Sequence, residues 1–570
     1  MNNEASHAIA AAIDDAEVIL AGAANPPQPP EDEHPVSTYS PPSLEIIRTC
    51  AKLDQNDTDN GKRLIAHFGA DILFVREIGA HIWNGTHWDP DGGQDAIERY
   101  AQEVARRIKL ESGAIMPSEA DAKAIEAFEK LRGLPEDGLS DGDRAVIKRG
   151  ADCAARLAKK RADRYKFAVS CGNRARTVAM IAQAQPHRSV APAALDSDPM
   201  AFNVQNGTLI FRRWMEEVED LECPDPSERR LSKRVRVSAS LIPHDRERLI
   251  AKIAPFVYDK RARCPHFFKF LRRMQPDRTQ RRFLQTAVGR AMIGGATTQA
   301  LIFLYGDGAN GKSVFMEVIA ELLGAYAGRL KPETITGSLE GRGDQATPDI
   351  ARLAGKRFVA IAELGRGAPL RESLVKTMTG GEPMPARHLN KGFFDLVPEF
   401  IPFMSGNDLP EVGGLDHGIW RRLKFVHWPV KIPPEEQRPL REMVDGMLAE
   451  APGILNWAIE GALRFLRDGL RDPPNVTALT AAHREDLDPV GAFLTACVRT
   501  REGSEVQARS MFEAFVSYCE ANAIRAWKET AFGRALKKKG LVRDDKRIRR
   551  WVDVELFDVP HRPEPRSPYD

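Results

Sequence analysis

The sequence predicts a multidomain protein with a mixed α/β fold around a nucleotide-binding core. A glycine-rich motif lies between a strand pattern and a helix pattern, and strands and helices alternate over residues 296–428. The chain has 570 residues, a length that suggests about three to five domains.

Two segments precede the core. Residues 1–45 are expected to form a flexible tail or linker, because their second half is rich in Pro, Ser and Glu. Residues 46–270 predict an α+β domain, with a hairpin turn at Asn84-Gly85. The other signals there are helices at 95–110, 119–131, 144–161 and 174–184, and a second turn within 202–211. A helical stretch over 265–291 then leads to the core.

The glycine-rich motif fits the phosphate-binding pattern G-x-x-x-x-G-K-[ST]. Its residues are Gly306, Asp307, Gly308, Ala309, Asn310, Gly311, Lys312 and Ser313. An apolar run predicts a strand at 301–305, and apolar residues at turn spacing predict a helix after the motif. Such a loop directs backbone N–H groups and the helix dipole at a polyphosphate. We expect all eight residues to bind ATP, with Lys312 reaching the β- and γ-phosphates and Ser313 ligating Mg²⁺.

Two further strand patterns end in polar residues. The strand at 357–363 ends in Glu363, and the strand at 400–408 contains Asn407 near its end. In a parallel sheet both would lie beside the phosphate loop. Glu363 is then a candidate to bind Mg²⁺ and activate water, and Asn407 a candidate to position that water. Taken alone, either could be a solvated or turn-capping side chain.

Adjacent arginines, Arg421 and Arg422, precede a strand pattern at 423–426. In ring-shaped ATPases one arginine reaches into the neighbouring subunit's site and neutralises charge there. The spacing does not decide between the two, and surface arginines are the simpler interpretation of such a pair.

The C-terminal third predicts helices and a small separate domain. Residues 431–487 are expected to be a helical connector, residues 488–557 a winged-helix-like domain, and residues 558–570 a tail. Two helices and a two-stranded hairpin predict the winged helix, in which the helix at 529–539 would enter a DNA groove. The candidate DNA contacts are Arg534, Lys537, Lys538, Lys539, Arg547 and Arg549. A solvated, basic helix end is the alternative interpretation.

Composition narrows the function classes. The net charge is +2, so any basic surface must be local. None of the seven cysteines forms a C-x-x-C pair, which argues against a zinc ribbon and favours small buried apolar residues. No signal peptide and no run of 18 apolar residues is present, so we expect a cytoplasmic protein without a membrane partner.

In order and spacing, these motifs resemble superfamily 3 DNA helicases, in particular the helicase part of phage, plasmid and poxvirus-type primase–helicases. The matching segments are 306–313, 358–363, 379–387, 405–407 and 418–422, and upstream 83–88 and 203–209. The resemblance covers about 50–430. It implies an AAA+-like core at 271–430 that forms a ring, usually a hexamer, and hydrolyses ATP between subunits while translocating on single-stranded DNA, typically 3′ to 5′.

The resemblance also implies a hairpin at 383–396 whose basic residues contact DNA in the ring pore. Lys391 is the first candidate, followed by Arg387 and His388; a solvated loop lysine is the alternative for Lys391. Only about 45 residues precede the matching region, too few for a primase domain. We therefore expect no primer synthesis by this chain alone, and a separate primase or initiator is a candidate partner.

The expected function is that of an ATP- and Mg²⁺-dependent helicase acting on single-stranded and forked DNA in the replication of a phage, plasmid or other mobile element. Two alternatives stay open. The chain could be a replication initiator that uses ATP only as an assembly switch, or a small-molecule kinase built on a phosphate-loop fold.

Overall fold

The structure is a computed structural model. It describes residues 40–135, 138–219, 231–295, 298–336, 348–365, 368–387, 393–413, 417–524, 526–544 and 548–558. The chain divides into two compact units. Unit 1 comprises the described residues up to 198 with 206–208 and 242–253, and unit 2 comprises the remainder. The predicted multidomain mixed α/β class is confirmed.

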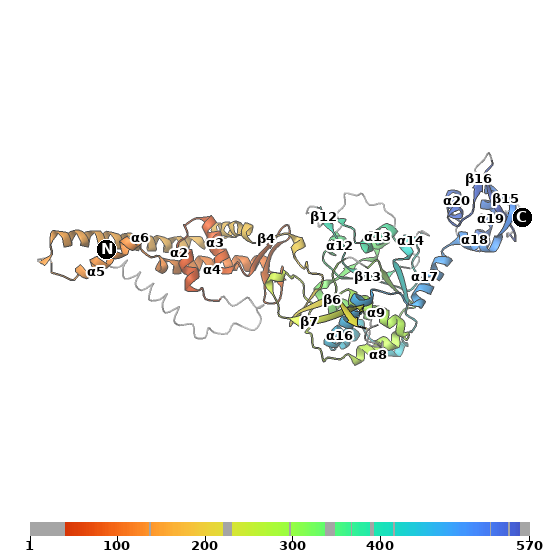
Figure 1. Ribbon diagram of the computed structural model, residues 1–570, viewed down its shortest axis with the longest axis horizontal. Coiled ribbons are helices and arrows are strands. Elements are labelled where there is room, and N and C mark those ends of the chain that lie inside the picture. The colour runs from red at the N-terminus through yellow and green to blue at the C-terminus, as the bar shows by residue number, and fades with distance from the viewer. Residues whose placement is uncertain are drawn as a thin grey trace. The chain divides into compact units, whose positions relative to one another are not determined.

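Unit 1 combines long helices with a small sheet, and its helix α6 lies along α4 and α5 (Figure 1). The sheet has the order β3-β2-β1-β4. The helices are α2 (Leu44–Ala51), α3 (Asp57–Phe68), α4 (Gly93–Ala114), α5 (Glu119–Leu131), α6 (Asp141–Cys171) and α7 (Arg174–Ala184). The strands are β1 (Ile72–Val75), β2 (Gly79–Trp83), β3 (Trp88–Asp89) and β4 (Ser189–Val190).

The local signals of unit 1 act as the sequence predicts. The turn between β2 and β3 is closed by Asn84, whose Oδ1 accepts from the backbone N–H groups of Thr86 and His87, both at 3.0 Å. Gly85 adopts φ +94°, which glycine tolerates. Helix α6 is longer than the predicted 144–161 at both ends, and a capping box of Ser140 and Asp143 sets its start.

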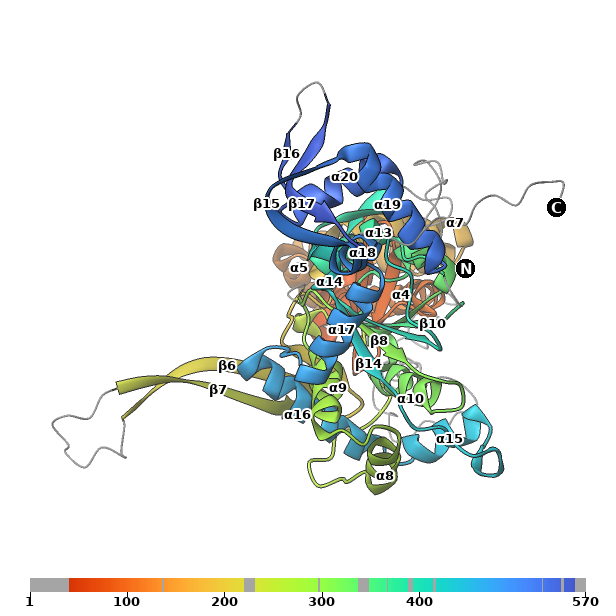
Figure 2. The same ribbon diagram turned by 90° about the vertical axis from the view of Figure 1, so that its right-hand side faces the viewer.

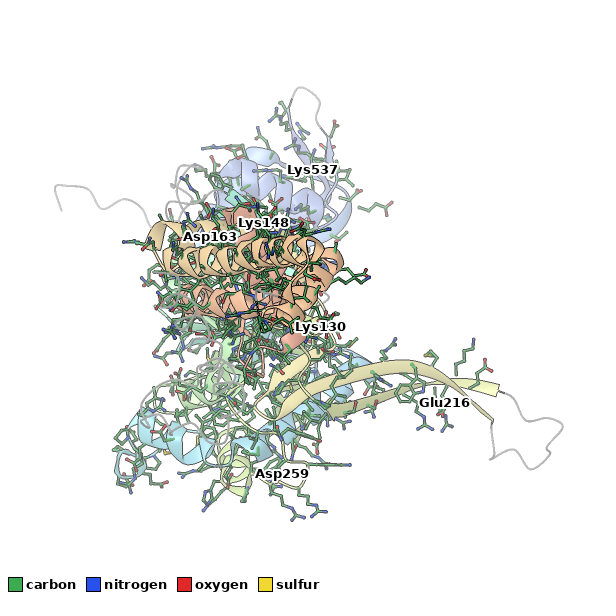
Figure 3. The ribbon with its side chains drawn as sticks, turned by 90° about the vertical axis from the view of Figure 1, so that its left-hand side faces the viewer. Lys130, Lys148, Asp163, Glu216, Asp259 and Lys537 are labelled. Atoms are coloured by element: carbon green, nitrogen blue, oxygen red, sulfur yellow. The ribbon has the colours of Figure 1, made fainter. Side chains whose placement is uncertain are left out.

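Unit 2 begins with a three-stranded sheet of order β5-β6-β7. Its strands are β5 (Ala201–Val204), β6 (Gly207–Glu219) and β7 (Leu231–Ile242). The sequence indicates the turn between β5 and β6 but not the length of the two following strands. These strands form a ribbon that extends outward in Figure 2 and carries Glu216, labelled in Figure 3.

The centre of unit 2 is a five-stranded sheet of order β14-β8-β13-β10-β9, in which every pairing is parallel. Its strands in chain order are β8 (Leu301–Tyr305), β9 (Ala327–Leu330), β10 (Phe358–Leu364), β13 (Ile401–Gly406) and β14 (Leu423–His427). Both faces are covered: Ile302 and Leu304 of β8 belong to one buried cluster, Leu301 and Phe303 to another. A near-continuous apolar strand is typical of this arrangement.

Helices cover this sheet. They are α8 (Pro265–Met274), α9 (Arg278–Arg290), α10 (Lys312–Leu323), α11 (Pro332–Ile335), α12 (Pro348–Ala351), α13 (Glu372–Gly380), α14 (His417–Trp420), α15 (Leu440–Leu448), α16 (Ala451–Asp468) and α17 (Pro474–Asp486). A separate antiparallel hairpin pairs β11 (Met384–Arg387) with β12 (Phe393–Leu396). Short 3-10 turns lie at 185–188, 192–194, 246–248, 324–326 and 434–436.

The single helical stretch predicted over 265–291 is in fact two helices. Pro276 follows α8, and the carboxylate of Asp277 accepts from the N–H of Thr279 at 2.6 Å to begin α9. Helix α9 packs closely on α16. A Cβ on Gly289 would lie 2.0 Å from the backbone nitrogen of Ala462, so only glycine permits this approach.

The C-terminal segment has the element order helix, strand, helix, helix, strand, strand. Its elements are α18 (Pro489–Cys497), β15 (Val498–Gln507), α19 (Ala508–Ala521), α20 (Glu529–Lys538), β16 (Arg543–Asp544) and β17 (Arg550–Leu556). The sheet is antiparallel with order β15-β17-β16. The sequence predicted a two-stranded hairpin, whereas the sheet has three strands. The sequence pattern does not predict strand β15, because the residues of this strand are mostly polar and exposed.

The six cysteines in the described ranges are free and buried, as expected for small apolar residues. Within those ranges, no helix is both long and apolar enough to cross a bilayer.

Candidate functional site

The glycine-rich loop joins the end of β8 to the start of α10, as the sequence predicts. Three of its residues have positive φ angles: Gly306 at +147°, Ala309 at +57° and Gly311 at +80°. Left-handed residues within such a turn allow backbone N–H groups to form a concavity that suits anions. Gly311 has no substitute here, because a Cβ would lie 2.8 Å from the Phe270 ring.

Lys312 begins α10 and is buried beneath the loop. Its ammonium group donates to the carbonyl oxygen of Gly306 and lies 3.5 Å from that of Asp307 and 3.4 Å from Oδ1 of Asn407. Burial lowers the pKa of Lys312, while the negative charges of Glu363 and Asp307 oppose that shift. These contacts hold the ammonium group against the loop and beside Asn407.

The parallel sheet brings Glu363 and Asn407 to the same edge. Asn407 directly follows β13, Glu363 is near the end of β10, and these strands are neighbours. The Asn407 side-chain amide donates to Oε1 of Glu363. Lys312, Asn407 and Glu363 therefore form one continuous polar chain, and both Glu363 and Asn407 are exposed at the sheet edge.

The residues that could bind Mg²⁺ are the Ser313 hydroxyl and the Glu363 carboxylate, both exposed beside the loop. They fit the ion, which prefers oxygen ligands. Over the residues that the structure describes, no group of three or more His, Cys, Asp and Glu could hold a metal. In nucleotide sites magnesium commonly takes its other ligands from phosphate oxygens and water.

A cavity of about 370 Å³ opens beside the loop, a size that suits a small ligand. Its lining comprises Tyr305, Gly306, Asp307, Asn310, Asn407, Asp408, Leu409, His427, Trp428, Pro429, Val430 and Lys431. The stretch 427–431 was not identified from the sequence. It reaches the loop because β14 pairs with β8: Asn310 donates to the Trp428 carbonyl at 3.2 Å, and His427 stacks on Tyr305 with ring centroids 4.8 Å apart.

The two candidate arginines differ in exposure. Arg422 is buried at 8% exposure, donates to the Gly418 carbonyl at 2.6 Å, and accepts through its own carbonyl from the N–H of Leu301. Arg421 is exposed. Arg422 thus connects α14 to strand β8 through hydrogen bonds, whereas the Arg421 side chain is exposed to solvent.

Among the predicted DNA contacts on the hairpin, Lys391 and His388 lie outside the described residues. Arg387 ends β11 and is half-buried, with its guanidinium carbon 5.1 Å from the centroid of the exposed Phe393 ring.

In the C-terminal segment, Arg534, Lys537 and Lys538 are exposed on α20, where Figure 3 labels Lys537. Arg549 is exposed just before β17, and Arg547 lies outside the described residues. Lys539 differs from these, because its ammonium pairs with Asp488 at the start of α18. That ion pair engages Lys539 within the segment.

Comparisons with known proteins agree with the sequence motifs. Residues 61–276 match the family described as "D5 N terminal like". The protein "Putative helicase L207/L206" of Acanthamoeba polyphaga mimivirus is 28% identical over 258 residues, 42% of this chain and 27% of its own length. "Putative helicase 022R" of Frog virus 3 is 24% identical over 292 residues, 48% of this chain and 30% of its own.

"Putative primase C962R" of African swine fever virus is 25% identical over 259 residues, which cover 42% of this chain and 26% of its own length. The chain thus spans less than a third of each of these three relatives. The matched domain and the viral relatives together make the chain similar to primase–helicases of viral type.

Proposed function

We propose that this chain is an ATP-dependent DNA helicase that works as a ring, most simply a hexamer, in the replication of a mobile element. The observation that carries the proposal is the polar chain of Lys312, Asn407 and Glu363 beneath a glycine loop at the carboxyl edge of a parallel sheet. The names of the viral relatives support an action on nucleic acid.

Each residue has a task that its surroundings support. Lys312 binds phosphate oxygens through an ammonium already aimed along the loop. Glu363, the carboxylate at the edge, accepts a proton from the attacking water, and Asn407 holds both Glu363 and that water in place. Mg²⁺ bound through Ser313 and Glu363 would neutralise phosphate charge.

Arg421 is the better candidate for the arginine that completes a neighbouring subunit's site. An arginine acting in trans must project from its own subunit, and Arg421 is exposed whereas Arg422 is buried against α14. Arg421→Ala should abolish ATP hydrolysis while nucleotide binding persists. Arg422→Ala should instead lower the stability of the fold, which thermal unfolding of the two variants would distinguish.

We further propose that the C-terminal segment is a winged-helix module that binds duplex DNA. Its element order supports that fold, and Arg534, Lys537 and Lys538 form an exposed basic row on α20. Lys391, His388 and Arg387 remain the proposed contacts to the translocating strand, with a 3′ to 5′ direction.

The deciding experiment is strand displacement on a tailed duplex with the full chain. Lys312→Ala should abolish both displacement and DNA-stimulated ATP hydrolysis, because the phosphate contacts are lost. Lys166→Ala, which removes an exposed lysine from α6 in unit 1, is the matched control and should behave as wild type. ATP hydrolysis that ignores DNA would favour the kinase, and duplex binding without displacement would favour the initiator.

A further inference from the structure

A second cavity of unit 2, of about 340 Å³, is lined by arginines. We call it the arginine groove. It lies where α8, α9 and α16 meet, and Figures 1 and 2 both show these helices side by side. Its arginines are Arg272 on α8, Arg278, Arg281 and Arg282 on α9, and Arg464 on α16. No residue of the groove belongs to the lining of the cavity beside the glycine loop.

The groove arginines lack carboxylate partners. Within the described part of the chain, none of the five forms an ion pair, although the adjacent Arg273 pairs with Glu436 at 2.5 Å. Arg464 donates to the side chain of Gln285 at 2.8 Å. Three carboxylates act on the groove without forming an ion pair. Glu460 and Asp468 oppose the lowering of the Arg464 pKa that burial causes and that Arg282 reinforces. The pKa of Asp277 is lowered by its hydrogen bond to Thr279 and also by the charge of Arg281. The groove therefore holds an excess of positive charge.

This arrangement is unfavourable for the helix itself. Arg278, Arg281 and Arg282 stand at i, i+3 and i+4 on one face of α9, and like charges at that spacing repel each other. Arg281 partly offsets the cost by donating to the carbonyl oxygens of Gln275 and Pro276, at 2.7 and 2.6 Å. Those contacts fix the direction of one guanidinium without neutralising it, so an external anion would relieve the repulsion.

Aromatic rings complete the groove and indicate which anion fits. Phe268 is 37% exposed at the rim, and the guanidinium carbon of Arg272 lies 5.7 Å from its ring centroid. Trp457 lines the floor. Guanidinium groups bind phosphate oxygens through paired N–H donors, and an exposed ring offers a surface on which a base can stack. An acidic peptide would pair with the guanidinium charges but would not stack on the Phe268 ring.

We propose that the arginine groove binds the backbone of single-stranded nucleic acid, with its guanidinium groups on successive phosphates and a base stacked on Phe268. The site is additional to the pore hairpin and to the C-terminal segment. It shares with the proposed function only the class of substrate, because it requires neither ATP nor hydrolysis.

The test is fluorescence anisotropy of a labelled oligothymidylate with the full chain, without nucleotide, over a range of salt. In Arg278→Gln/Arg282→Gln two phosphate contacts are lost, so the slope of log affinity against log salt should fall by about 1.4. Affinity curves that converge near 1 M salt then differ by about 25-fold near 0.1 M. Arg106→Gln/Arg156→Gln carries the same charge change on exposed arginines of unit 1 and should match wild type.

A second measurement locates the contact even if other sites contribute to affinity. Oligothymidylate should protect Arg278 and Arg282 of the wild-type chain from modification by phenylglyoxal, read by mass spectrometry of α9 peptides. Arg278→Lys/Arg282→Lys should recover the salt slope, because charge sets that slope, and the unfolding midpoint of each variant checks its fold.

Unchanged salt slope in the glutamine variant together with unprotected α9 arginines would overturn the proposal. Stronger protection by polyglutamate than by oligothymidylate would also overturn it, in favour of an acidic protein partner. Lys312→Ala separates this inference from the proposed function: it should lose ATP hydrolysis and keep the groove contact. If the groove binds no nucleic acid, strand displacement by the wild-type chain is still expected.

Discussion

Arginines form two clusters in this chain, and the clusters differ in what surrounds them. In unit 1, Arg63 and Arg164 flank the fully buried carboxylate of Glu111, and Arg63 also donates to the carbonyl oxygen of Asp54 at 2.8 Å. In the arginine groove of unit 2, five arginines have no carboxylate partner in the described residues. A guanidinium group satisfied by buried acceptors serves the fold, whereas one held at a surface without a counter-charge is available to a ligand.

The largest effect is expected when the carboxylate of Glu111, which Arg63 and Arg164 share, is removed. Glu111→Gln should destabilise unit 1 by about 3–5 kcal/mol, because it leaves two buried cations without a counter-charge. Hydrogen exchange of α3 and α4 peptides in the full chain would measure the change, since whole-chain unfolding of several units is not two-state.

The matched control for Glu111→Gln is Glu119→Gln on α5. Glu119 is 85% exposed and pairs with Lys123 at 2.8 Å, so its loss should cost less than about 1 kcal/mol. Equal protection in Glu111→Gln and wild type would mean that the buried cluster does not support the fold, and the distinction between the two clusters would fail.

A second way to sharpen the comparison uses His67 of unit 1, which lies against Arg107 and is also affected by the charge of Arg63. Its Nδ1 is 3.3 Å from an Arg107 nitrogen, and burial, then Arg107 and Arg63, lower its pKa from 6.5 to about 4. The folded form binds this proton less readily than the unfolded form, so stability should be lost as the pH falls from 6.5 towards 4.

The variant His67→Gln isolates that effect because glutamine does not titrate. Between pH 6.5 and 4.5 the wild type should lose on the order of 2 kcal/mol more stability than His67→Gln. Acid titration of α3 exchange protection in both proteins would measure it. Parallel loss in the two proteins would show that burial and the surrounding arginines do not keep His67 neutral.

Local sequence signals predicted much of the fold. The loop at 306–311, the strand before it and the helix from Lys312 are consecutive in the chain, so apolar periodicity and glycine positions suffice to predict them. The meeting of Glu363 and Asn407 was also predictable, because parallel strands end at one edge of a sheet.

Features that depend on distant pairing were not predictable from the sequence. The stretch 427–431 enters the cavity only because β14 pairs with β8. The arginine groove joins α9 to Arg464, which lies far along the chain and reaches α9 through glycine contacts between the two helices. A single sequence contains no signal for either approach, whereas the row on α9 alone is indistinguishable from a solvated helix face.

The smallest predicted effect is a gain in stability, whereas the larger effects are losses. Arg282→Gln removes a like-charge neighbour of Arg278 at i−4, and glutamine has nearly the helix propensity of arginine. The stability of α9 should therefore rise by about 0.2–0.5 kcal/mol at low ionic strength, and the gain should vanish near 1 M salt. Hydrogen exchange of α9 peptides at the two salt concentrations would detect it.

Arg441→Gln on α15 is the matched control for this last prediction, because Arg441 pairs with Glu321 and Asp445, each at 2.5 Å. Its removal should cost a few tenths of a kcal/mol under the same conditions. A loss of stability in Arg282→Gln of the size seen in Arg441→Gln would mean that the groove arginines are satisfied within the fold. The groove would then hold no unsatisfied positive charge for a ligand to neutralise.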